Sequence, residues 1–191
     1  MKLTEKIQKA IDFSAAKHIN QRRKAGGLPY IVHPFSVAWI LADYVGDEDV
    51  VVAGLLHDVL EDVKGSSFEE IEREFGSRVA RIVKDVSEDK DPNFPEAEKM
   101  TWEDRKKKYL VHLHSAGVEA IYVSAADKIH NLMSLKQRYD AVGEEVWETF
   151  NAGREKSFWF YGEVMKVVKE RMPEHPLTAL YEEIFNEFLR S

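Results

Sequence analysis

A histidine and an aspartate, His57 and Asp58, stand side by side in a stretch that is otherwise largely apolar, LLHDVLEDV. Ionisable groups among apolar residues need partners, because leaving them buried and unpaired costs several kcal/mol. Glu61 follows His57 by four residues and would lie one turn along on a continuous helix. Asp62 follows Asp58 at the same spacing. Taken alone, the His-Asp pair fits a hydrogen bond inside the core better than a catalytic site.

Two distant residues make a metal site the better interpretation. His33 precedes a proline and so brings a second imidazole to the start of a helix. Asp127 follows two alanines, which would let another helix or a metal ion approach, and Asn131 lies one turn further on the same face. Together with His57-Asp58 they supply nitrogen and carboxylate ligands. Such a set suits Mn²⁺, Fe²⁺ or Zn²⁺ better than Ca²⁺.

Composition and charge exclude several classes of protein. The chain has 191 residues, 44% of them hydrophobic, and no cysteine. A chain of this length buries roughly 70% of its surface, enough for a core without a structural metal, so a bound metal would serve chemistry. The net charge of −7 repels polyanions and argues against a nucleic-acid binder. Without an apolar leader or a run of roughly 18 apolar residues, we expect a cytoplasmic protein that binds no membrane.

The residues named above must be positioned by helices. Apolar residues recur at helical spacing along nearly the whole chain, which predicts an all-α fold, a single-domain helical bundle over residues 1–191. Capping residues and prolines set the expected helices at residues 4–20, 34–46, 47–63, 67–76, 102–114 and 118–138, with two more in the C-terminal third. The segment 87–100 holds two prolines and many charges, so we expect a loop over the site.

Several separate motifs, in order, resemble a known family. The arrangement of His33, His57-Asp58 and Asp127 is similar to the H…HD…D signature of the HD superfamily of metal-dependent phosphohydrolases. More narrowly, four segments resemble the hydrolase domain of the RelA/SpoT family and its small relatives, the alarmone hydrolases. These segments are RRKAGGLPYIVHPFSVA, LLHDVLEDV, FGSRVARIVKDVSEDK and AADKIHNL. That family removes the 3′-diphosphate of ppGpp and pppGpp as pyrophosphate, usually with Mn²⁺. The resemblance implies an HD-type helical fold and this activity.

The resemblance also implies individual roles. The implied metal ligands are His33, His57, Asp58 and Asp127. Glu61 and Asp62 would position and activate the attacking water, although without the neighbouring ligands they fit the solvated end of a helix equally well. Arg23 and Lys24 would face the phosphates or the guanine base, or else form only a solvated helix end. Asn131 would orient the nucleotide.

Other polar residues have weaker assignments. Lys90, Arg105 and Lys106 are candidates for contacts to the distal phosphates, but a basic run such as residues 105–108 more often forms a solvated helix face. Tyr30 could pack near the nucleotide or in the core. His130 is assigned no ligand role, since by helical geometry it lies about 90° or more from the face of Asn131.

Three positions depart from the alarmone-hydrolase pattern. Val63, Ser124 and Met133 stand where that family commonly has Thr, Lys and Arg. The changes leave the ligand set intact but remove cations that would hold a doubly pyrophosphorylated nucleotide. Two alternatives therefore stay open: an HD-domain phosphohydrolase acting on another nucleotide or phosphate ester, and a catalytically silent helical module that binds a nucleotide. The expected partner is a small-molecule nucleotide, and one sequence does not predict the oligomeric state.

Overall fold

The structure, a computed structural model, describes residues 1–23, 27–88, 101–149 and 152–190. Within these ranges every regular element is a helix, and strand-like pairing is limited to one antiparallel bridge between Arg22 and Pro29. The all-α prediction is therefore confirmed. The helices are α1 (Glu5–Lys17), α2 (Val32–Tyr44), α3 (Glu48–Leu56), α4 (Val59–Asp62), α5 (Phe68–Phe75), α6 (Ser77–Val86), α7 (Trp102–Ser115), α8 (Val118–Val142), the 3-10 helix η2 (Gly143–Thr149), α9 (Gly153–Arg171) and α10 (Pro176–Leu189).

Polar side chains begin several of these helices, as the sequence predicts. The Asp47 carboxylate accepts hydrogen bonds from the first amides of α3, and the Ser67 hydroxyl accepts one from the first turn of α5. Thr101 and Asp104 cap each other's backbone amides at the start of α7. Pro176 occupies the first turn of α10, where its missing N–H leaves no bond unmade.

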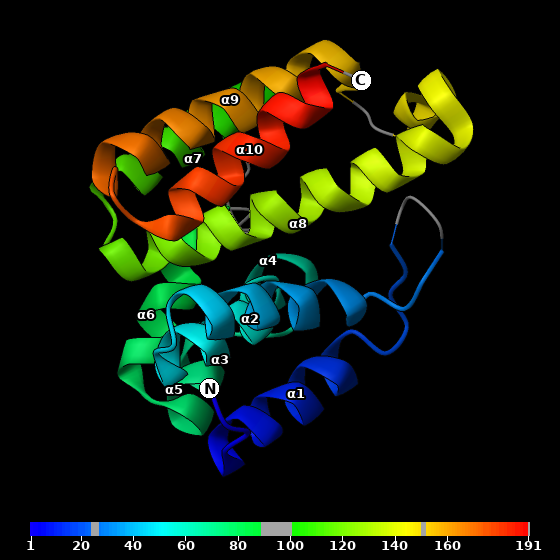
Figure 1. Ribbon diagram of the computed structural model, residues 1–191. Coiled ribbons are helices and arrows are strands. Elements are labelled where there is room, and N and C mark those ends of the chain that lie inside the picture. Colours follow the sequence, from blue (N-terminus) through cyan, green and yellow to red (C-terminus); the bar gives the residue numbers. More distant parts are fainter. Residues whose placement is uncertain (24–26, 89–100, 150–151, 191) are drawn as a thin grey trace.

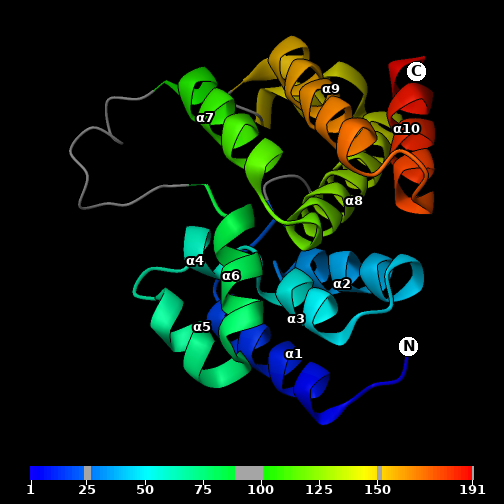
Figure 2. The same ribbon diagram turned by 90° about the vertical axis from the view of Figure 1, so that its left-hand side faces the viewer.

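The helices form two apolar clusters that share α8, which runs between them (Figure 1). Helices α1 to α6 form one group, and α7, α9 and α10 form the other; the view turned by 90° shows the same division (Figure 2). Ala120 and Val123 of α8 pack in the first cluster, whereas Ile121 and Ile129 pack in the second. Because α8 contributes to both clusters, the middle of the helix is covered on two faces, and Asp127 there is buried.

One predicted helix is broken at its most important point. The sequence predicts a continuous helix over 47–63, but α3 ends at Leu56 and α4 begins at Val59. The His57 imidazole donates from Nδ1 to the Gly54 carbonyl oxygen at 2.8 Å, which occupies an acceptor at the end of α3. Consecutive side chains of a regular helix point about 100° apart. His57 and Asp58 keep right-handed backbone angles but fall between the two helices, so the expected single helix with His57 stacked over Glu61 is wrong.

A glycine at a helix contact also bears on the site. Gly54 lies where α3 meets α2, and a Cβ there would stand 2.4 Å from the Leu41 Cδ1 atom, so glycine permits the close approach of the two helices.

No helix was expected over residues 77–86, where the structure has α6, which follows Gly76 with a φ of 92°. The expected loop over 87–100 lies outside the described residues apart from Ser87 and Glu88. Within the described ranges, none of the helices is both long and apolar enough to cross a bilayer.

Candidate metal centre

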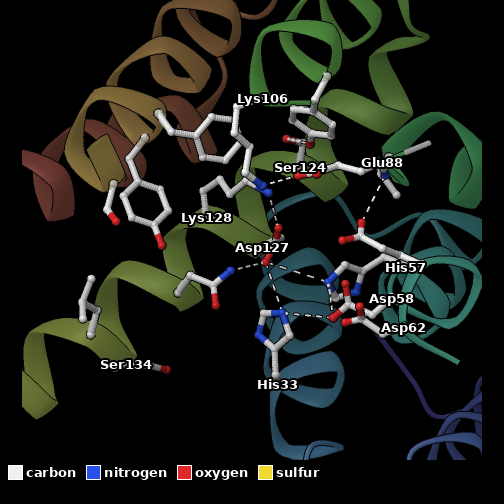
Figure 3. A pocket seen from close by; sticks show the side chains of 18 of the residues that line it. His33, His57, Asp58, Asp62, Glu88, Lys106, Ser124, Asp127, Lys128 and Ser134 are labelled. Atoms are coloured by element: carbon white, nitrogen blue, oxygen red, sulfur yellow. Dashed lines mark hydrogen bonds and ion pairs between the residues drawn. The ribbon is translucent and has the colours of Figure 1, made fainter. Parts of the chain in front are cut away.

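Four side chains from three separate stretches of chain meet beside α8 (Figure 3). His33 comes from the first turn of α2, His57 and Asp58 from the junction of α3 and α4, and Asp127 from the middle of α8. The His33 Nε2 atom lies 3.1 Å from Asp127 Oδ1 and 3.5 Å from Asp58 Oδ2. The His57 Nε2 atom lies 3.2 Å from Asp58 Oδ2 and 3.8 Å from Asp127 Oδ1. The residues predicted as ligands are thus brought together.

The hydrogen bonding of His57 indicates what this cluster can bind. Its Nδ1 donates to the Gly54 carbonyl, so the neutral ring has a lone pair on Nε2. This Nε2 atom is buried and makes no hydrogen bond within the described part of the chain, although carboxylate oxygens of Asp58 and Asp127 lie close to it. A buried lone pair facing two carboxylates is unfavourable without a cation. A divalent cation satisfies all three groups at once, so the residues present fit a metal ion.

Burial perturbs the ionisation of the candidate ligand residues. It lowers the pKa of His33 to about 3, which keeps that imidazole neutral. Burial also raises the pKa of Asp58 to about 6, with a further contribution from the nearby charge of Asp127. For Asp127 burial acts in the same direction, but the adjacent ammonium of Lys128 and the His33 ring outweigh it and hold its pKa well below the usual range. The charged form of Asp58 is thus disfavoured without a nearby cation, whereas Lys128 already stabilises the charged form of Asp127.

Tyr30 connects the cluster to one of the two acids predicted to act on water. Its hydroxyl donates to Asp58 Oδ2 at 2.7 Å and to Asp62 Oδ2 at 3.2 Å. Tyr30 therefore lines the site, which the sequence left open. The other acid, Glu61, accepts a hydrogen bond at Oε2 from the Glu88 amide at 3.1 Å. Both acids line the same cavity as the metal cluster, on the side of α4.

The residues predicted to contact the nucleotide also reach this cavity. The Arg23 Nη2 atom donates to Asn131 Oδ1 at 2.8 Å, and its guanidinium lies over the Tyr30 ring at 5.8 Å from the centroid. The Asn131 amide in turn donates to Asp127 Oδ1 at 2.5 Å. Asn131 thus bonds directly to Asp127, and Arg23 is linked to the cluster through Asn131. Lys24 lies outside the described residues.

The cavity has a volume of about 600 Å³, and Lys106 and Lys128 are among the basic residues that line it. Lys106 of α7 forms an ion pair with Glu88, and its Nζ lies 4.4 Å from the centroid of the Phe160 ring. Lys128 forms an ion pair with Asp127. The sequence missed Lys128, although a lysine within the buried run AADKIHNL was a signal for it. Ser124, at the position where the family commonly has lysine, exchanges a 2.8 Å hydrogen bond with the Tyr109 hydroxyl.

His130 lies directly behind one of the candidate ligands. Its Nδ1 atom is 2.7 Å from the Nδ1 atom of His33, and its Nε2 atom is 3.4 Å from the Ser134 hydroxyl. Burial lowers the pKa of His130 to about 4, so this ring too is neutral. The sequence assigned it no ligand role, and its contact is with a candidate ligand, His33, on another helix.

Comparison with known proteins places the chain in a family. The model of the HD-domain family matches residues 10–156. The chain is 40% identical over 137 residues to guanosine-3′,5′-bis(diphosphate) 3′-pyrophosphohydrolase MESH1 of Danio rerio, covering 70% of this chain and 71% of that one. Identity to the Xenopus tropicalis MESH1 is 42% over 134 residues, covering 69% and 70% of the two chains.

Solved structures agree with these relatives. The structure of a metazoan SpoT ortholog that hydrolyses ppGpp has a TM-score of 0.76 at 26% identity, covering 98% of this chain and 97% of that one. The structure of lmo0812 from Listeria monocytogenes EGD-e has a TM-score of 0.71 at 28% identity, covering 83% and 99%. The match over residues 10–156 and the 40% identity to MESH1 show that this chain belongs to the HD-domain family, as a relative of the MESH1 pyrophosphohydrolases.

Proposed function

We propose that this protein is a metal-dependent pyrophosphohydrolase that removes pyrophosphate from the 3′ position of guanosine 3′,5′-bis(diphosphate), ppGpp, or a closely similar nucleotide. The observation that carries the proposal is the buried, unpartnered Nε2 atom of His57, which faces the carboxylates of Asp58 and Asp127. The relationship to enzymes named for this reaction supports the choice of substrate.

The metal would be held by His33, His57, Asp58 and Asp127. We propose Mn²⁺ as the ion, with Fe²⁺ and Zn²⁺ as alternatives that the same mixture of nitrogen and oxygen ligands accepts. A divalent cation held there would lower the pKa of a coordinated water and offset negative charge on the phosphoryl oxygens. Lys128 holds the carboxylate of Asp127 in place through its ion pair.

The chain's own side chains supply the remaining functions. Asp62, held by the Tyr30 hydroxyl, and Glu61 would position the attacking water and accept its proton. The water oxygen forms a bond to phosphorus as the bond between phosphorus and the ribose 3′-oxygen breaks. That oxygen takes up a proton, and pyrophosphate leaves.

The proposal also covers nucleotide binding, the domain and the location of the protein. Arg23, Lys24 and Asn131 would hold the nucleotide beside the metal, with Arg23 suited to bidentate phosphate contact or to stacking. We assign residues 1–191 to one HD-type domain, which the sharing of α8 by both apolar clusters supports. We place the protein in the cytoplasm, where a nucleotide substrate of this kind would be available.

Purified protein loaded with Mn²⁺ and incubated with ppGpp tests the proposal. We expect release of pyrophosphate, and loss of at least 99% of that release in Asp58→Ala and Asp127→Ala. Asp140→Ala is the matched control, because Asp140 is an exposed carboxylate on the same helix as Asp127 and pairs only with Lys136 in the described part of the chain. Absence of turnover under every divalent metal would refute the proposal.

A second activity is favoured by the hydroxyl at position 124. Because Ser124 pairs with Tyr109 and brings no cation to the cavity, a substrate with fewer phosphates would fit the same metal centre. A panel of nucleoside mono-, di- and triphosphates beside ppGpp decides between the two. Preference for a 5′-monophosphate would favour the second activity. A protein that binds nucleotide but holds no metal, with a stability that does not respond to Mn²⁺, would be a silent binding module.

A further inference from the structure

The contact between His33 and His130 restricts where each ring can carry its hydrogen. Two Nδ1 atoms at 2.7 Å form a hydrogen bond only if one carries a hydrogen and the other does not. A neutral imidazole has one N–H, so the position of the hydrogen on one ring sets its position on the other. The far nitrogen of His130 faces the Ser134 hydroxyl, which can donate or accept. The three side chains therefore share two consistent arrangements.

In the first arrangement His33 carries its hydrogen on Nε2. That nitrogen then donates to Asp127 Oδ1 at 3.1 Å, and His33 Nδ1 accepts from His130 Nδ1. The Nε2 atom of His130 accepts from Ser134. Every nitrogen of the two rings then has a hydrogen-bond partner, but His33 Nε2 has no lone pair with which to bind a metal ion.

In the second arrangement each ring carries its hydrogen on the other nitrogen. His33 then donates from Nδ1 to His130, and its Nε2 lone pair faces Asp58 and Asp127. His130 donates from Nε2 to the Ser134 hydroxyl, and the number of protons bound by the two rings is unchanged. Only this arrangement allows His33 to act as a ligand. His57 differs, because the Gly54 carbonyl holds its hydrogen on Nδ1 independently of a second ring.

We propose that His130 is a positioning residue for His33, and that cation binding at the cluster switches both rings from the first arrangement to the second. The proposal rests on the metal role assigned to His33 above. It places the acceptor that His33 needs on α8, one residue before Asn131 and three after Asp127, so that a single helix supplies a ligand and the partner of another ligand.

Metal affinity tests the role of His130. Mn²⁺ is titrated into metal-free protein, and the free ion is measured by electron paramagnetic resonance. We expect His130→Leu to weaken Mn²⁺ binding about 10- to 100-fold, the usual effect of removing the partner of a ligating histidine. His130→Asn retains an amide oxygen near the position of Nδ1 and should bind within a few-fold of the unsubstituted protein. His112→Leu, at an exposed histidine of α7, is the matched control.

Thermal unfolding of the metal-free variants separates positioning from folding. A purely structural role would lower the midpoint of His130→Leu and of His130→Asn alike and would not produce a selective loss of Mn²⁺ affinity in the leucine variant. Rescue of affinity by asparagine supports the proposal. Equal Mn²⁺ affinity in His130→Leu and the unsubstituted protein would overturn it.

Nitrogen NMR of ¹⁵N-histidine-labelled protein observes the switch itself. Zn²⁺ serves as the diamagnetic probe. We expect His130 to carry its hydrogen on Nδ1 in the metal-free protein and on Nε2 after Zn²⁺ is added. A hydrogen that stays on Nδ1 of His130 in the Zn²⁺-loaded protein would overturn the proposal.

Asp58→Ala distinguishes a wrong role for His130 from a wrong metal site. If that variant binds Mn²⁺ as tightly as the unsubstituted protein, the metal site is misplaced and both proposals fail. If Asp58→Ala loses Mn²⁺ while His130→Leu keeps it, the site stands and only the role of His130 is wrong.

Discussion

The two candidate imidazole ligands are prepared for binding in different ways. His57 is set by a backbone carbonyl three residues away, so local chain structure alone frees its Nε2 atom. His33 depends on His130, which lies 97 residues further along the chain. The ligand set therefore combines one nitrogen that is always available with one whose availability depends on the packing of α2 against α8. Substitutions that loosen the contact between α2 and α8 should consequently affect the nitrogen of His33 more than that of His57.

Lys106 gives a prediction about the substrate at the scale of single residues. Its ammonium lines the cavity and is paired with Glu88. We expect Lys106→Ala to raise the KM for ppGpp about tenfold or more while kcat falls less, since a charged hydrogen bond contributes about 1.5–3 kcal/mol. Lys107→Ala is the control, because Lys107 is exposed and pairs with Glu103 on the surface. Steady-state kinetics that gave both variants the same KM would contradict a phosphate contact for Lys106.

At the scale of elements, the site depends on how closely α2 and α3 approach. His33 begins α2 and His57 follows the end of α3, so the spacing of these helices sets the distance between the two imidazoles. The ring centroids lie 5.1 Å apart. Gly54 permits this spacing, because a larger residue would meet Leu41 of α2, which is fully buried. Helix packing and ligand geometry are therefore coupled.

Gly54→Ala should destabilise the protein, against the usual helical preference. Alanine in a helix interior is ordinarily better than glycine by up to about 1 kcal/mol. Here its Cβ would lie 2.4 Å from Leu41 Cδ1 in a filled core, and overpacking of this kind costs about 1–3 kcal/mol. Urea unfolding of the metal-free protein measures the difference. Gly162→Ala is the matched control, since its Cβ would meet Phe185 at an ordinary 3.5 Å and should be neutral or stabilising.

Arg78 should stabilise the junction of three helices in a pH-dependent way. From α6 it pairs with Asp47 at the start of α3, at 2.9 Å, and with Glu119 at the start of α8, at 2.9 Å. The hydrogen bond from Arg78 lowers the pKa of Asp47 below its ordinary value. We expect Arg78→Met to lose about 1 kcal/mol at pH 7, a modest value because these groups are partly exposed.

The sign of the pH dependence follows from that lowered pKa. Stability from an acid whose pKa is depressed on folding is complete above its unfolded value, near 4, and is lost as the pH falls through the folded value. The difference in unfolding free energy between the unsubstituted protein and Arg78→Met should therefore be constant between pH 6 and 8 and shrink below about pH 4. Arg81→Met, on the same helix, should show no such change. A difference that persisted undiminished at pH 2 would contradict this account.

At the scale of the whole molecule, α8 connects the two groups of helices and also carries Asp127 to the site (Figure 1). The other candidate ligands belong to α2 and to the junction of α3 and α4, in the first group. A cation bound by all four would thus join the first group of helices to α8. Its binding energy would add to the apolar contacts that already hold α8 in place.

Mn²⁺ should therefore raise the thermal stability of the folded chain. A ligand that binds only the folded state contributes about 2.7 kcal/mol at a free concentration of 100 times its Kd, which corresponds to a Tm increase of several degrees for a chain of this size. Thermal unfolding with Mn²⁺ and with EDTA measures the shift. Asp127→Ala should abolish it, whereas Asp140→Ala should not. An equal shift in Asp127→Ala would place the stabilising ion elsewhere.

Local patterns in the sequence determined the all-helical fold, the caps at Asp47, Ser67 and Thr101, and the family, because spacing and motif order are properties of neighbouring residues. They also singled out the ligand set as a prediction. Only the tertiary structure revealed the break at His57-Asp58 and the pairing of His33 with His130. The pairing joins residues 97 apart in the chain, which no local pattern encodes. The break comes at a helix end where the Gly54 carbonyl accepts from the His57 side chain instead of from another turn.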